Sequence, residues 1–385
     1  MSKKITVLYI FHEAMSSGGA TYSGMNMIKS LDKTKIYPIV MVPEEGDIKE
    51  KMVAIGVKCI VAPVDFMFRS HDHTNLVRRC AHCYKRLKAH IKSFVLDCKT
   101  IDKEIGNIHV DIVHSNTAAI LTGFVLSKYL HCKHVWHLRE FIDKDFHEKP
   151  YLGFWLMRKC INAADATISI TNAVKKHWIR SKTKNAFQIF NAVKSVSSLN
   201  PINFNKEKYF LFCANLVEKY KGADLAMEGF CKSAMYKKGY KLVYVGNYRD
   251  EYKEELLEKA KEVGAENLVE FVGYCKDTTS YYAKATAFLM CSENEAMGRT
   301  TIEAFRNGCP VLGRNTGGTP ELVKNGETGY LFDTVEQLAN LMVSITKEDN
   351  SHVIECAREF AICNFTEEGY GKKVEKVYRT ILKQQ

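Results

Sequence analysis

Short apolar segments with β-strand character alternate along this chain with amphipathic stretches, and this alternation sets the fold class. In the first half the strand-like segments are Ile5–Phe11, Tyr37–Val42, Val57–Ala62, Val110–Ser115, His134–Leu138, Ala166–Ile170 and Phe187–Phe190. A second series contains Tyr209–Cys213, Lys241–Val245, Val269–Gly273, Ala287–Cys291, Val311–Arg314 and Gly329–Phe332. Alternating strands and helices form parallel sheets. The sequence therefore predicts an α/β fold with two successive Rossmann-like units.

The chain length supports two domains, because 385 residues exceed what one ordinary core holds. A polar, turn-rich stretch at residues 200–205 suits a linker. We predict an N-terminal domain over 1–198, a C-terminal domain over 206–365 and a final helix over 366–385. A ligand cleft is expected at the carboxyl ends of the parallel strands.

Composition narrows the class of protein. The chain is 46% hydrophobic and 26% charged, which is typical of a globular protein, and it contains no apolar run of membrane-spanning length. Its thirteen cysteines are scattered, which favours reduced thiols in the cytoplasm. We interpret the first apolar run as a strand rather than a signal peptide. A net charge of +11 predicts an anionic partner: a nucleotide diphosphate, an acidic lipid surface or a nucleic acid.

Two carboxylates, Glu295 and Glu303, flank a glycine turn at the point where a strand gives way to a helix. Gly308 and Pro310 then end the helix. Helix N-terminal amides favour an anion, whereas carboxylates accept hydrogen bonds from sugar hydroxyls. The pattern suits a sugar phosphate or nucleotide sugar, although Glu303 taken alone could be an ordinary surface glutamate.

The spacing of these carboxylates resembles the Glu-x7-Glu signature of retaining GT-B glycosyltransferases of family 4. The Gly-Gly-Thr-x-Glu-Leu sequence at residues 317–322 lies where that family has a matching loop. The resemblance implies two facing Rossmann-like domains, an NDP-sugar donor and a terminal helix that crosses back to the first domain. It also implies that Glu295 binds donor-sugar hydroxyls, that Glu303 binds ribose hydroxyls, and that the contact is lined by Met297, Gly298 and Arg299.

The segment from Phe212 to Asp224 resembles the family's Gly-Arg-Leu…Lys-Gly sequence, whose Arg and Lys hold the diphosphate. Lys221 is retained, but Asn215 stands where Arg is usual, and the spacing is one residue longer. Losing one charge-assisted hydrogen bond typically costs about 1.5–3 kcal/mol. Either donor binding is weak, or another cation (Lys219, Arg299 or Arg139) takes over. The plainer interpretation of Lys221 is a solvated lysine at a helix start.

Gly18 and Gly19 follow the first strand and open a helix that runs to Leu31. They do not form the Gly-x-Gly-x-x-Gly pattern of dinucleotide sites, so NAD is disfavoured. A plain turn between strand and helix would explain them. The resemblance places the pair beside the donor diphosphate and the acceptor.

Two further candidates end a strand of the N-terminal half, His137 and Arg139. The resemblance implies that His137 points at the donor sugar. Arg139, a planar cation, could hold a phosphate or an acidic acceptor. His114 is a weaker candidate that could support the loop instead.

No metal or other cofactor is expected. Asp143 and Asp145 form an Asp-x-Asp pair that is common by chance in polar loops. Cys80 and Cys83, with His71, His73 and His90 nearby, have no second Cys-x-x-Cys to complete a zinc site.

The resemblance implies front-face retaining transfer, in which the leaving diphosphate helps to deprotonate the acceptor and no protein nucleophile is needed. Glu295, His137 and Lys221 are the predicted catalytic residues.

Residues 77–104 contain eight Lys and Arg against three Asp and Glu, together with a partial apolar face. Such a helix could lie on an anionic bilayer or could be an ordinary surface helix.

The resemblance thus predicts a cytoplasmic transferase, peripheral at the inner face of the membrane, that uses UDP- rather than GDP-sugar and a glycan or lipid-linked acceptor. Capsule, exopolysaccharide or related surface-glycan synthesis is the expected setting. The alternatives are a sugar-nucleotide epimerase or phosphorylase, a catalytically inactive sugar-binding homologue, and a nucleic-acid-binding protein, which is disfavoured because no binding module is recognised.

Overall fold

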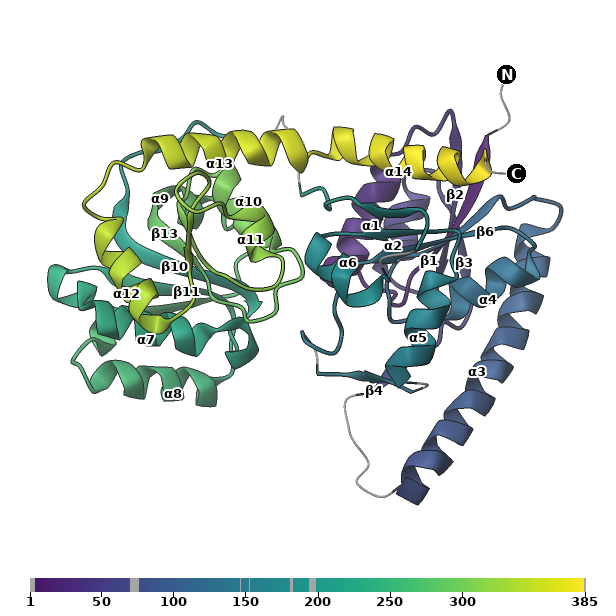
Figure 1. The fold of residues 1–385 in the computed structure, drawn as a ribbon, viewed down its shortest axis with the longest axis horizontal. Coiled ribbons are helices and arrows are strands. Elements are labelled where there is room, and N and C mark those ends of the chain that lie inside the picture. The colour runs from purple at the N-terminus through teal and green to yellow at the C-terminus, as the bar shows by residue number, and fades with distance from the viewer. Residues whose placement is uncertain are drawn as a thin grey trace. The chain divides into compact units, whose positions relative to one another are not determined.

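The structure is a computed structural model that describes residues 4–69, 76–145, 147–151, 153–180, 183–193 and 199–383. It divides into two compact units. Unit 1 comprises Met1–Ala192 and Glu367–Gln385, and unit 2 comprises Val193–Thr366. Figure 1 shows both units as α/β structures, and each is described by itself.

Unit 1 is built on a parallel sheet of strand order β3-β2-β1-β5-β6-β8-β9 in the described part of the chain. The strands are β1 (Ile5–Ile10), β2 (Ile36–Val42), β3 (Lys58–Val61), β5 (Ile112–Ser115), β6 (Lys133–Leu138), β8 (Ala166–Ser169) and β9 (Ala186–Gln188). The helices are α1 (Gly19–Ser30), α2 (Asp47–Val53), α3 (Leu76–Ile105), α4 (Thr122–Tyr129), α5 (Gly153–Asn162), α6 (Asn172–Trp178) and α14 (Glu367–Leu382). A short antiparallel pair, β4 (Phe68–Arg69) and β7 (Lys149–Pro150), was not predicted, because two-residue strands leave no periodic signal.

Alternate residues of β1 face opposite sides of the unit 1 sheet. Val7 and Tyr9 belong to a buried cluster that also contains residues of α1, α2 and α14. Leu8 and Ile10 belong to a second cluster with residues of α3 and α4. Because helices cover both faces, β1 has no polar alternation, which is why its sequence is a continuous apolar run.

The last helix, α14, packs within unit 1. Its apolar residues at helical spacing are buried: Tyr370, Val374, Val377, Tyr378 and Ile381. Oε1 of Glu375 accepts a hydrogen bond of 2.8 Å from the backbone N–H of Asp32. A Cβ at Gly371 would lie 2.2 Å from the carbonyl oxygen of Ser30, so only glycine allows α14 to approach α1 this closely.

Unit 2 contains a second parallel sheet of order β12-β11-β10-β13-β14-β15 among the described residues. Its strands are β10 (Glu207–Leu216), β11 (Lys241–Asn247), β12 (Val269–Gly273), β13 (Ala285–Met290), β14 (Val311–Arg314) and β15 (Tyr330–Phe332). Its helices are α7 (Ala223–Ser233), α8 (Asp250–Lys261), α9 (Thr279–Lys284), α10 (Arg299–Arg306), α11 (Thr319–Leu322), α12 (Val335–Ser344) and α13 (Ser351–Asn364). The 3-10 turns are η2 (Lys219–Lys221), η3 (Met235–Lys238) and η4 (Glu266–Leu268).

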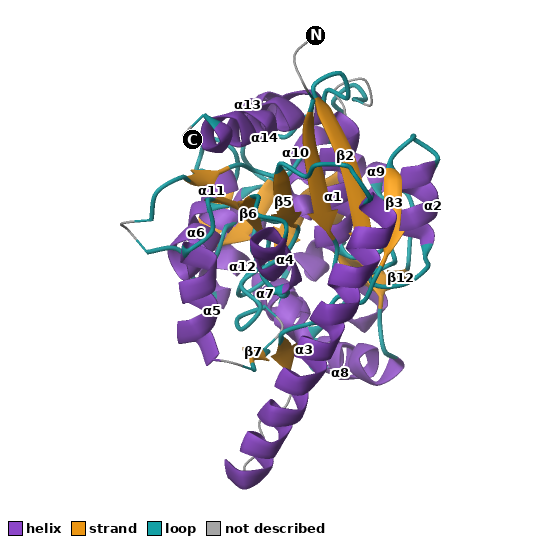
Figure 2. Ribbon diagram, turned by 90° about the vertical axis from the view of Figure 1, so that its right-hand side faces the viewer, coloured by secondary structure: helices purple, strands orange, loops and turns teal. Residues whose placement is uncertain are grey.

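The central strands of this sheet are also buried on both sides, and residues of α7, α8 and α12 complete one side of the core. Figure 2 shows the strands of both sheets enclosed by helices. Each predicted strand corresponds to an observed one, with ends that differ by a few residues. The predicted α/β class with two parallel sheets is therefore confirmed.

Candidate functional site

The side chains of Lys221 and Glu295 meet at the carboxyl end of the unit 2 sheet. Nζ of Lys221 lies 3.2 Å from Oε2 of Glu295. The other carboxylate oxygen, Oε1, accepts a hydrogen bond of 3.1 Å from the backbone N–H of Gly298. The two side chains remain 31% and 18% exposed, so both keep a face that a ligand can reach. A cation and a carboxylate are thus held side by side in two of the predicted site positions.

Glycine at 222 allows the Lys221 segment to lie against the end of β13. Gly222 has a φ of +77°, and a Cβ there would lie 2.3 Å from the carbonyl oxygen of Cys291. The hydroxyl of Ser292 donates to the carbonyl of Lys221 over 3.4 Å, which is a weak contact across the same junction. The Lys-Gly sequence therefore places the lysine beside the strand that leads to Glu295.

The Gly-Gly-Thr loop fixes the backbone of Glu295 from the other side. The N–H of Gly318 donates a hydrogen bond of 2.7 Å to the carbonyl oxygen of Glu295. Gly317 has a φ of +59°, and a Cβ at this position would lie 2.5 Å from the same oxygen. The two sequence motifs that carried the resemblance are thus one structural unit, held together at Glu295.

The remaining residues of the motif form the start of α10. Met297 is buried, and Gly298 takes the N-cap position with a φ of +88°. Arg299 and Glu303 lie in the first two turns of the helix and are half-buried. The N-terminal end of α10 presents backbone amides close to Lys221, and amides and lysine together favour an anion.

Asn215 lies near the end of β10 and is exposed. Its backbone carbonyl accepts a hydrogen bond of 3.2 Å from Nδ2 of Asn247. The pairing of β10 with β11 shifts register between Cys213 and Leu216. Lys219 is also exposed, on the loop that follows. Asn215 brings no charge to the end of β10. The cationic side chains that lie in the Lys-Gly and Glu-x7-Glu segments are Lys219, Lys221 and Arg299.

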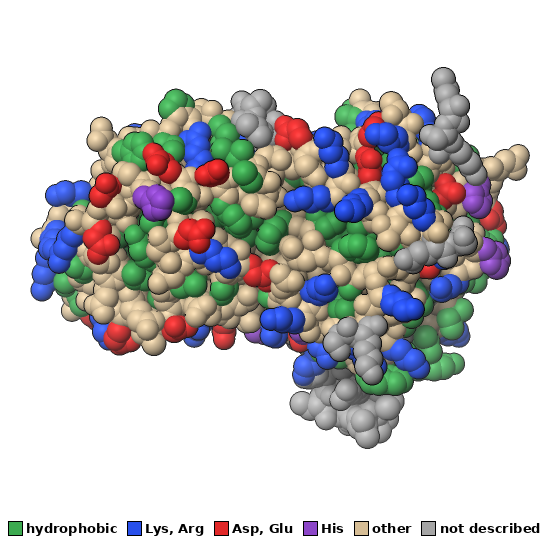
Figure 3. Space-filling view, turned by 45° about the horizontal axis from the view of Figure 1, so that its top comes forward, with side chains coloured by type: hydrophobic (Ala, Val, Ile, Leu, Met, Phe, Trp, Pro, Cys, Tyr) green, Lys and Arg blue, Asp and Glu red, His purple; other side chains and the backbone are tan. Residues whose placement is uncertain are grey.

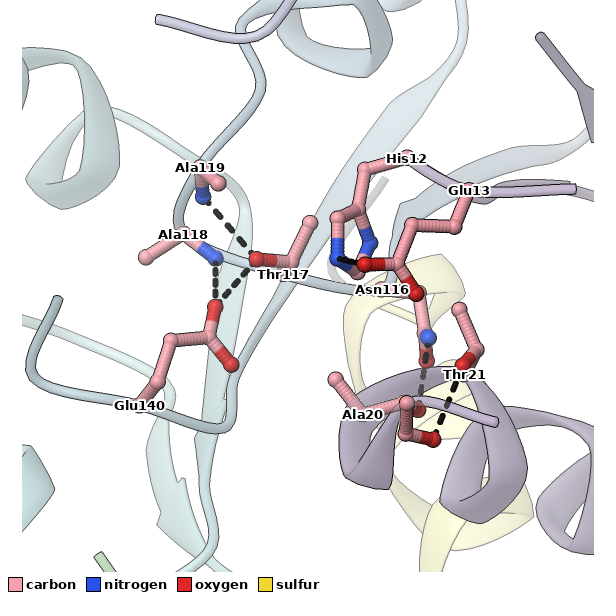
Figure 4. A network of polar contacts seen from close by, with 10 residues as sticks. His12, Glu13, Ala20, Thr21, Asn116, Thr117, Ala118, Ala119 and Glu140 are labelled. Atoms are coloured by element: carbon pink, nitrogen blue, oxygen red, sulfur yellow. Dashed lines mark hydrogen bonds and ion pairs between the residues drawn. The ribbon is translucent and has the colours of Figure 1, made fainter. Parts of the chain in front are cut away.

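Unit 1 places a second polar group at the carboxyl end of its own sheet, shown in Figure 4. His12 and Glu13 follow β1, Asn116 and Thr117 follow β5, and Glu140 follows β6. Nε2 of His12 lies 3.6 Å from Oε1 of Glu13. Glu140 accepts hydrogen bonds from the hydroxyl of Thr117 and, over 2.9 Å, from the N–H of Ala118.

The glycines at 18 and 19 belong to this edge. Gly18 is the N-cap of α1, and a Cβ there would lie 2.6 Å from Oε2 of Glu13. A Cβ at Gly19, in contrast, would meet no atom within 4 Å. Gly18 therefore makes room for the Glu13 carboxylate, whereas packing does not require glycine at 19.

His12, Glu13 and Glu140 were not among the predicted site residues. Burial raises the pKa of the Glu140 carboxyl to about 7 and also raises that of Glu13. Burial, with a smaller effect of the Arg139 charge, lowers the pKa of His12 to about 4. A polar residue directly after a predicted parallel strand was the signal that could have identified them.

The structure buries His137 and Arg139 inside unit 1, where Arg139 contacts Asn116 of this polar group. His137 lies within β6 and is fully buried, and Arg139 is 4% exposed. The Arg139 guanidinium donates to the side chains of Asn116 (3.0 Å), Asn191 and Tyr370 (3.1 Å). Both side chains thus have hydrogen-bond partners inside unit 1, and their contact with a donor sugar, phosphate or acceptor stays a prediction.

The ring of His137 is neutral in this network. Its Nδ1 lies 3.3 Å from Nη2 of Arg139, and because a guanidinium can only donate, Nδ1 is the acceptor. Nε2 of His114 lies 3.2 Å from Nδ1 of His137. Nδ1 of His114 lies 2.7 Å from the hydroxyl of Tyr378. Burial, followed by the charge of Arg139, holds the pKa of both histidines well below the usual value. The pair ties β5 and β6 to α14.

The two motifs considered for metals have other surroundings. Oδ1 of Asp143 lies 3.0 Å from Nε2 of His177, and Oδ2 of Asp145 accepts a hydrogen bond of 3.1 Å from the N–H of Phe141. His71 and His73, and the side chains of Cys80, Cys83 and His90, lie outside what the structure describes. Within the described residues, no three His, Cys, Asp or Glu side chains gather as metal ligands would.

Residues 197–359 match the family model described as "Glycosyl transferases group 1". The α-1,3/1,6-mannosyltransferase ALG2 of Dictyostelium discoideum is 31% identical over 185 residues, which cover 43% of this chain and 44% of that protein. The O-antigen biosynthesis glycosyltransferase WclY of Escherichia coli is 22% identical over 71% of this chain and 80% of its own length. The crystal structure of Anabaena HepE in complex with UDP superposes with a TM-score of 0.75 at 17% identity, covering 98% of this chain and all of that one.

Two parallel α/β units with a Glu-x7-Glu segment joined to a Gly-Gly-Thr loop define the GT-B class of protein. The match to the glycosyl transferases group 1 model covers residues 197–359, which lie within unit 2 and make up less than half of the chain. The chain spans 35% to 48% of the length of the first three curated relatives that it matches. None of the helices in the described residues is both long and apolar enough to cross a bilayer.

Proposed function

We propose that the protein is a retaining glycosyltransferase that moves a sugar from a UDP-sugar to a glycan or lipid-linked saccharide. The observation that supports this most is the contact between Lys221 and Glu295 beside the N-terminal end of α10. A lysine and helix amides suit a diphosphate, and a carboxylate 3.2 Å away suits the hydroxyls of the attached sugar. One side-chain pair thus meets the two chemical demands of a nucleotide sugar.

In the reaction, Lys221 and the amides of α10 stabilise the negative charge that develops on the diphosphate as the glycosidic bond breaks. Glu295 accepts hydrogen bonds from the sugar and holds its anomeric carbon toward the acceptor. The departing diphosphate takes the proton of the acceptor hydroxyl on the same face of the sugar. No metal ion is assigned a role, because Lys221 and the helix amides supply the positive charge.

The structural similarity to HepE, which was crystallised with UDP, supports UDP as the nucleotide. Asn215 supplies no charge where the family usually has Arg, a difference worth about 1.5–3 kcal/mol of binding. Lys219 and Arg299 belong to the same unit as Lys221 and are the cations that we expect to compensate. Arg139 is buried and is assigned no phosphate.

A role in surface-glycan synthesis, such as capsule or exopolysaccharide, is supported by the similarity to WclY, whose name refers to O-antigen biosynthesis. We place the protein in the cytoplasm, since the eleven cysteines that the structure describes are all free thiols.

We also propose peripheral binding to an anionic membrane through α3. The N-terminal half of α3 extends away from the rest of unit 1 in Figures 1 and 2.

The described surface of α3 has the character of an interfacial helix. Its exposed apolar side chains are Tyr84, Leu87, Ile91, Val95 and Leu96, and its exposed lysines are Lys85, Lys88, Lys92, Lys99 and Lys103. The C-terminal half instead buries Cys98, Ile101 and Ile105 against the sheet. On the face in Figure 3, Lys and Arg side chains are plentiful on the part at the right. Anionic lipid would meet attractive charge there.

A transfer assay tests this function. The protein is incubated with a panel of UDP- and GDP-sugars and with lipid-linked or free saccharides, and nucleotide release and the anomeric configuration of the product are followed by NMR. We expect UDP release that depends on the acceptor, with retained configuration. Donor turnover without an acceptor would favour an epimerase, and a requirement for inorganic phosphate would favour a phosphorylase. Absence of turnover, with UDP-sugar binding intact, would indicate an inactive sugar-binding homologue.

A further inference from the structure

Unit 1 contains a pocket that the glycosyl-transfer chemistry above does not use. It has a volume of about 590 Å³ and lies among α5, α6 and the loop after β6. The lining residues are Lys144, Trp155, Arg158, Ala173, Lys176, His177, Trp178, Ile179 and Arg180. All of them belong to one unit, and the volume is in the range of small-molecule sites.

The lining is strongly cationic. Lys144, Arg158, Lys176 and Arg180 are basic residues, and none of the lining residues is a carboxylate. Two acids, Asp143 and Asp145, flank Lys144 in the sequence. The carboxylate of Asp143 contacts His177 at 3.0 Å, and that of Asp145 accepts a hydrogen bond of 3.1 Å from the N–H of Phe141. Among the described residues, no carboxylate forms an ion pair with any of the four cations. Like charges gathered without counter-charges destabilise a fold, so a bound anion would relieve this repulsion.

Arg158 is held in place rather than free in solvent. Its guanidinium carbon lies 5.5 Å from the ring centre of Phe154, which orients the planar group. Its Nε is buried and has no hydrogen-bond partner among the described residues. A buried N–H without an acceptor costs free energy. An oxygen-rich anion in the pocket would supply that acceptor.

An exposed tryptophan completes the pocket. Trp155 is 66% exposed, whereas Trp178 at the floor is buried and donates a hydrogen bond of 2.9 Å to the carbonyl of Glu140. Nζ of Lys159 lies 5.0 Å from the ring centre of Trp155, which keeps another cation nearby. A flat aromatic face beside several cations suits an organic phosphate, whose carbon skeleton packs on the ring while its oxygens meet the charges.

We propose that this pocket binds the phosphate group of a phosphorylated small molecule or lipid headgroup. Arg158 and Arg180 donate paired hydrogen bonds to the phosphate oxygens, and Lys144 and Lys176 add charge. Trp155 packs against the organic part. This site involves neither Lys221 nor Glu295, so it can be tested independently of sugar transfer.

Tryptophan fluorescence reports on this pocket directly. The chain has three tryptophans. Trp136 and Trp178 are buried, so Trp155 is the one whose exposure to solvent a ligand in the pocket would change. We titrate the full-length protein with glycerol 3-phosphate and, separately, with phosphatidylcholine vesicles that contain phosphatidic acid. The double variant Lys176→Glu, Arg180→Glu is compared with Lys237→Glu, Lys238→Glu, which changes the net charge equally on exposed residues of unit 2.

We expect a saturable fluorescence change that is lost in Trp155→Phe and weakened about 10-fold or more in the pocket variant, with the control variant unaffected. Saturation by glycerol 3-phosphate assigns the site to soluble phosphates, and saturation by vesicles alone assigns it to headgroups. No saturable change with either probe would overturn the assignment. Equal weakening in both double variants would also overturn it, because binding would then reflect overall charge.

Discussion

Lys221 and Glu295 are 74 residues apart in sequence, yet Nζ of the first lies 3.2 Å from Oε2 of the second. Two glycines make this contact possible. Gly222 allows the lysine segment to approach Cys291, and Gly317 allows the Gly-Gly-Thr loop to approach the backbone of Glu295. The charged pair is therefore a product of close backbone packing, and changes in that packing have predictable effects.

Replacing Gly222 by alanine should destabilise unit 2 more than the same change at Gly264. Both glycines have positive φ, 77° and 69°, so alanine strains either position by about 1–2 kcal/mol. Only at 222 would the new Cβ also meet the backbone, at 2.3 Å from the Cys291 carbonyl oxygen, which adds about 1–3 kcal/mol. Scanning calorimetry of the two variants measures the difference. Equal thermal midpoints would show that the close approach at 222 has no energetic consequence.

Arg139→Met should lower stability by about 2–4 kcal/mol, because it leaves the buried side chains of Asn116 and Asn191 without their donor. Tyr370→Phe removes one hydroxyl of the same network and should cost about 1 kcal/mol. Chemical denaturation of both variants, read beside UDP-sugar turnover, separates two roles for Arg139. A variant that stays as stable as the wild type but loses turnover would restore Arg139 as a ligand-binding residue.

The stability of unit 1 should depend on pH through Asp97 of α3. This side chain is 1% exposed, and burial, followed by the charge of Asp65, raises its pKa from 3.8 to about 7. A carboxyl with a raised pKa binds its proton more tightly in the folded state. Its contribution to stability is therefore complete below pH 3.8 and is lost as the pH rises through 7.

Asp97→Asn removes this titration and should raise the thermal midpoint above pH 7, by a few degrees if the gain is about 1 kcal/mol. Near pH 4 the variant and the wild type should be alike, because the carboxyl is then protonated in the folded protein. Thermal melts at both pH values check the prediction. A benefit of the same size at both pH values would mean that the carboxyl is ionised throughout.

Binding of α3 to membranes should depend on its lysines. Lys85→Glu, Lys88→Glu and Lys92→Glu together should abolish co-sedimentation with vesicles containing phosphatidylglycerol, since each basic residue near an anionic surface contributes about 1 kcal/mol. The matched control reverses Lys372, Lys373 and Lys376, which are exposed on α14. Vesicle binding that survives in the first triple variant, or fails equally in the control, would contradict a specific role of α3.

The fold was predictable because β1, β10 and β13 are buried on both faces, and such strands appear in sequence as continuous apolar runs. Glu295 and Lys221 could also be singled out, because Lys221 directly precedes Gly222 and Glu295 lies three residues before Gly298. His137 and Arg139 were harder to interpret. A strand-end position does not reveal whether a side chain points to solvent or into the core, and their burial depends on Tyr370 and Asn191, which lie far away in sequence.

Glu13 and Glu140 illustrate the opposite difficulty. Each follows a strand that the sequence predicts correctly, but neither belongs to a motif that would single it out from other glutamates. Their raised pKa values arise from burial at a sheet edge, which only the folded chain creates. The basic pocket around Arg158 had no sequence signal either, because its four cations come from α5, the residues around α6 and the loop after β6.

Calorimetric titration of UDP, and of a UDP-sugar, into the wild type and into Lys221→Ala, Glu295→Ala and Glu293→Ala tests the assignment of the nucleotide-sugar site most directly. Glu293 is exposed and two residues from Glu295, so it serves as the control. We predict saturable binding by the wild type and by Glu293→Ala, and a loss of about 10- to 150-fold in Lys221→Ala. Glu295→Ala should lose affinity for UDP-sugar more than for UDP, because its carboxylate meets the sugar. Binding of UDP that is equally strong without Lys221, or no binding by the wild type, would contradict the assignment.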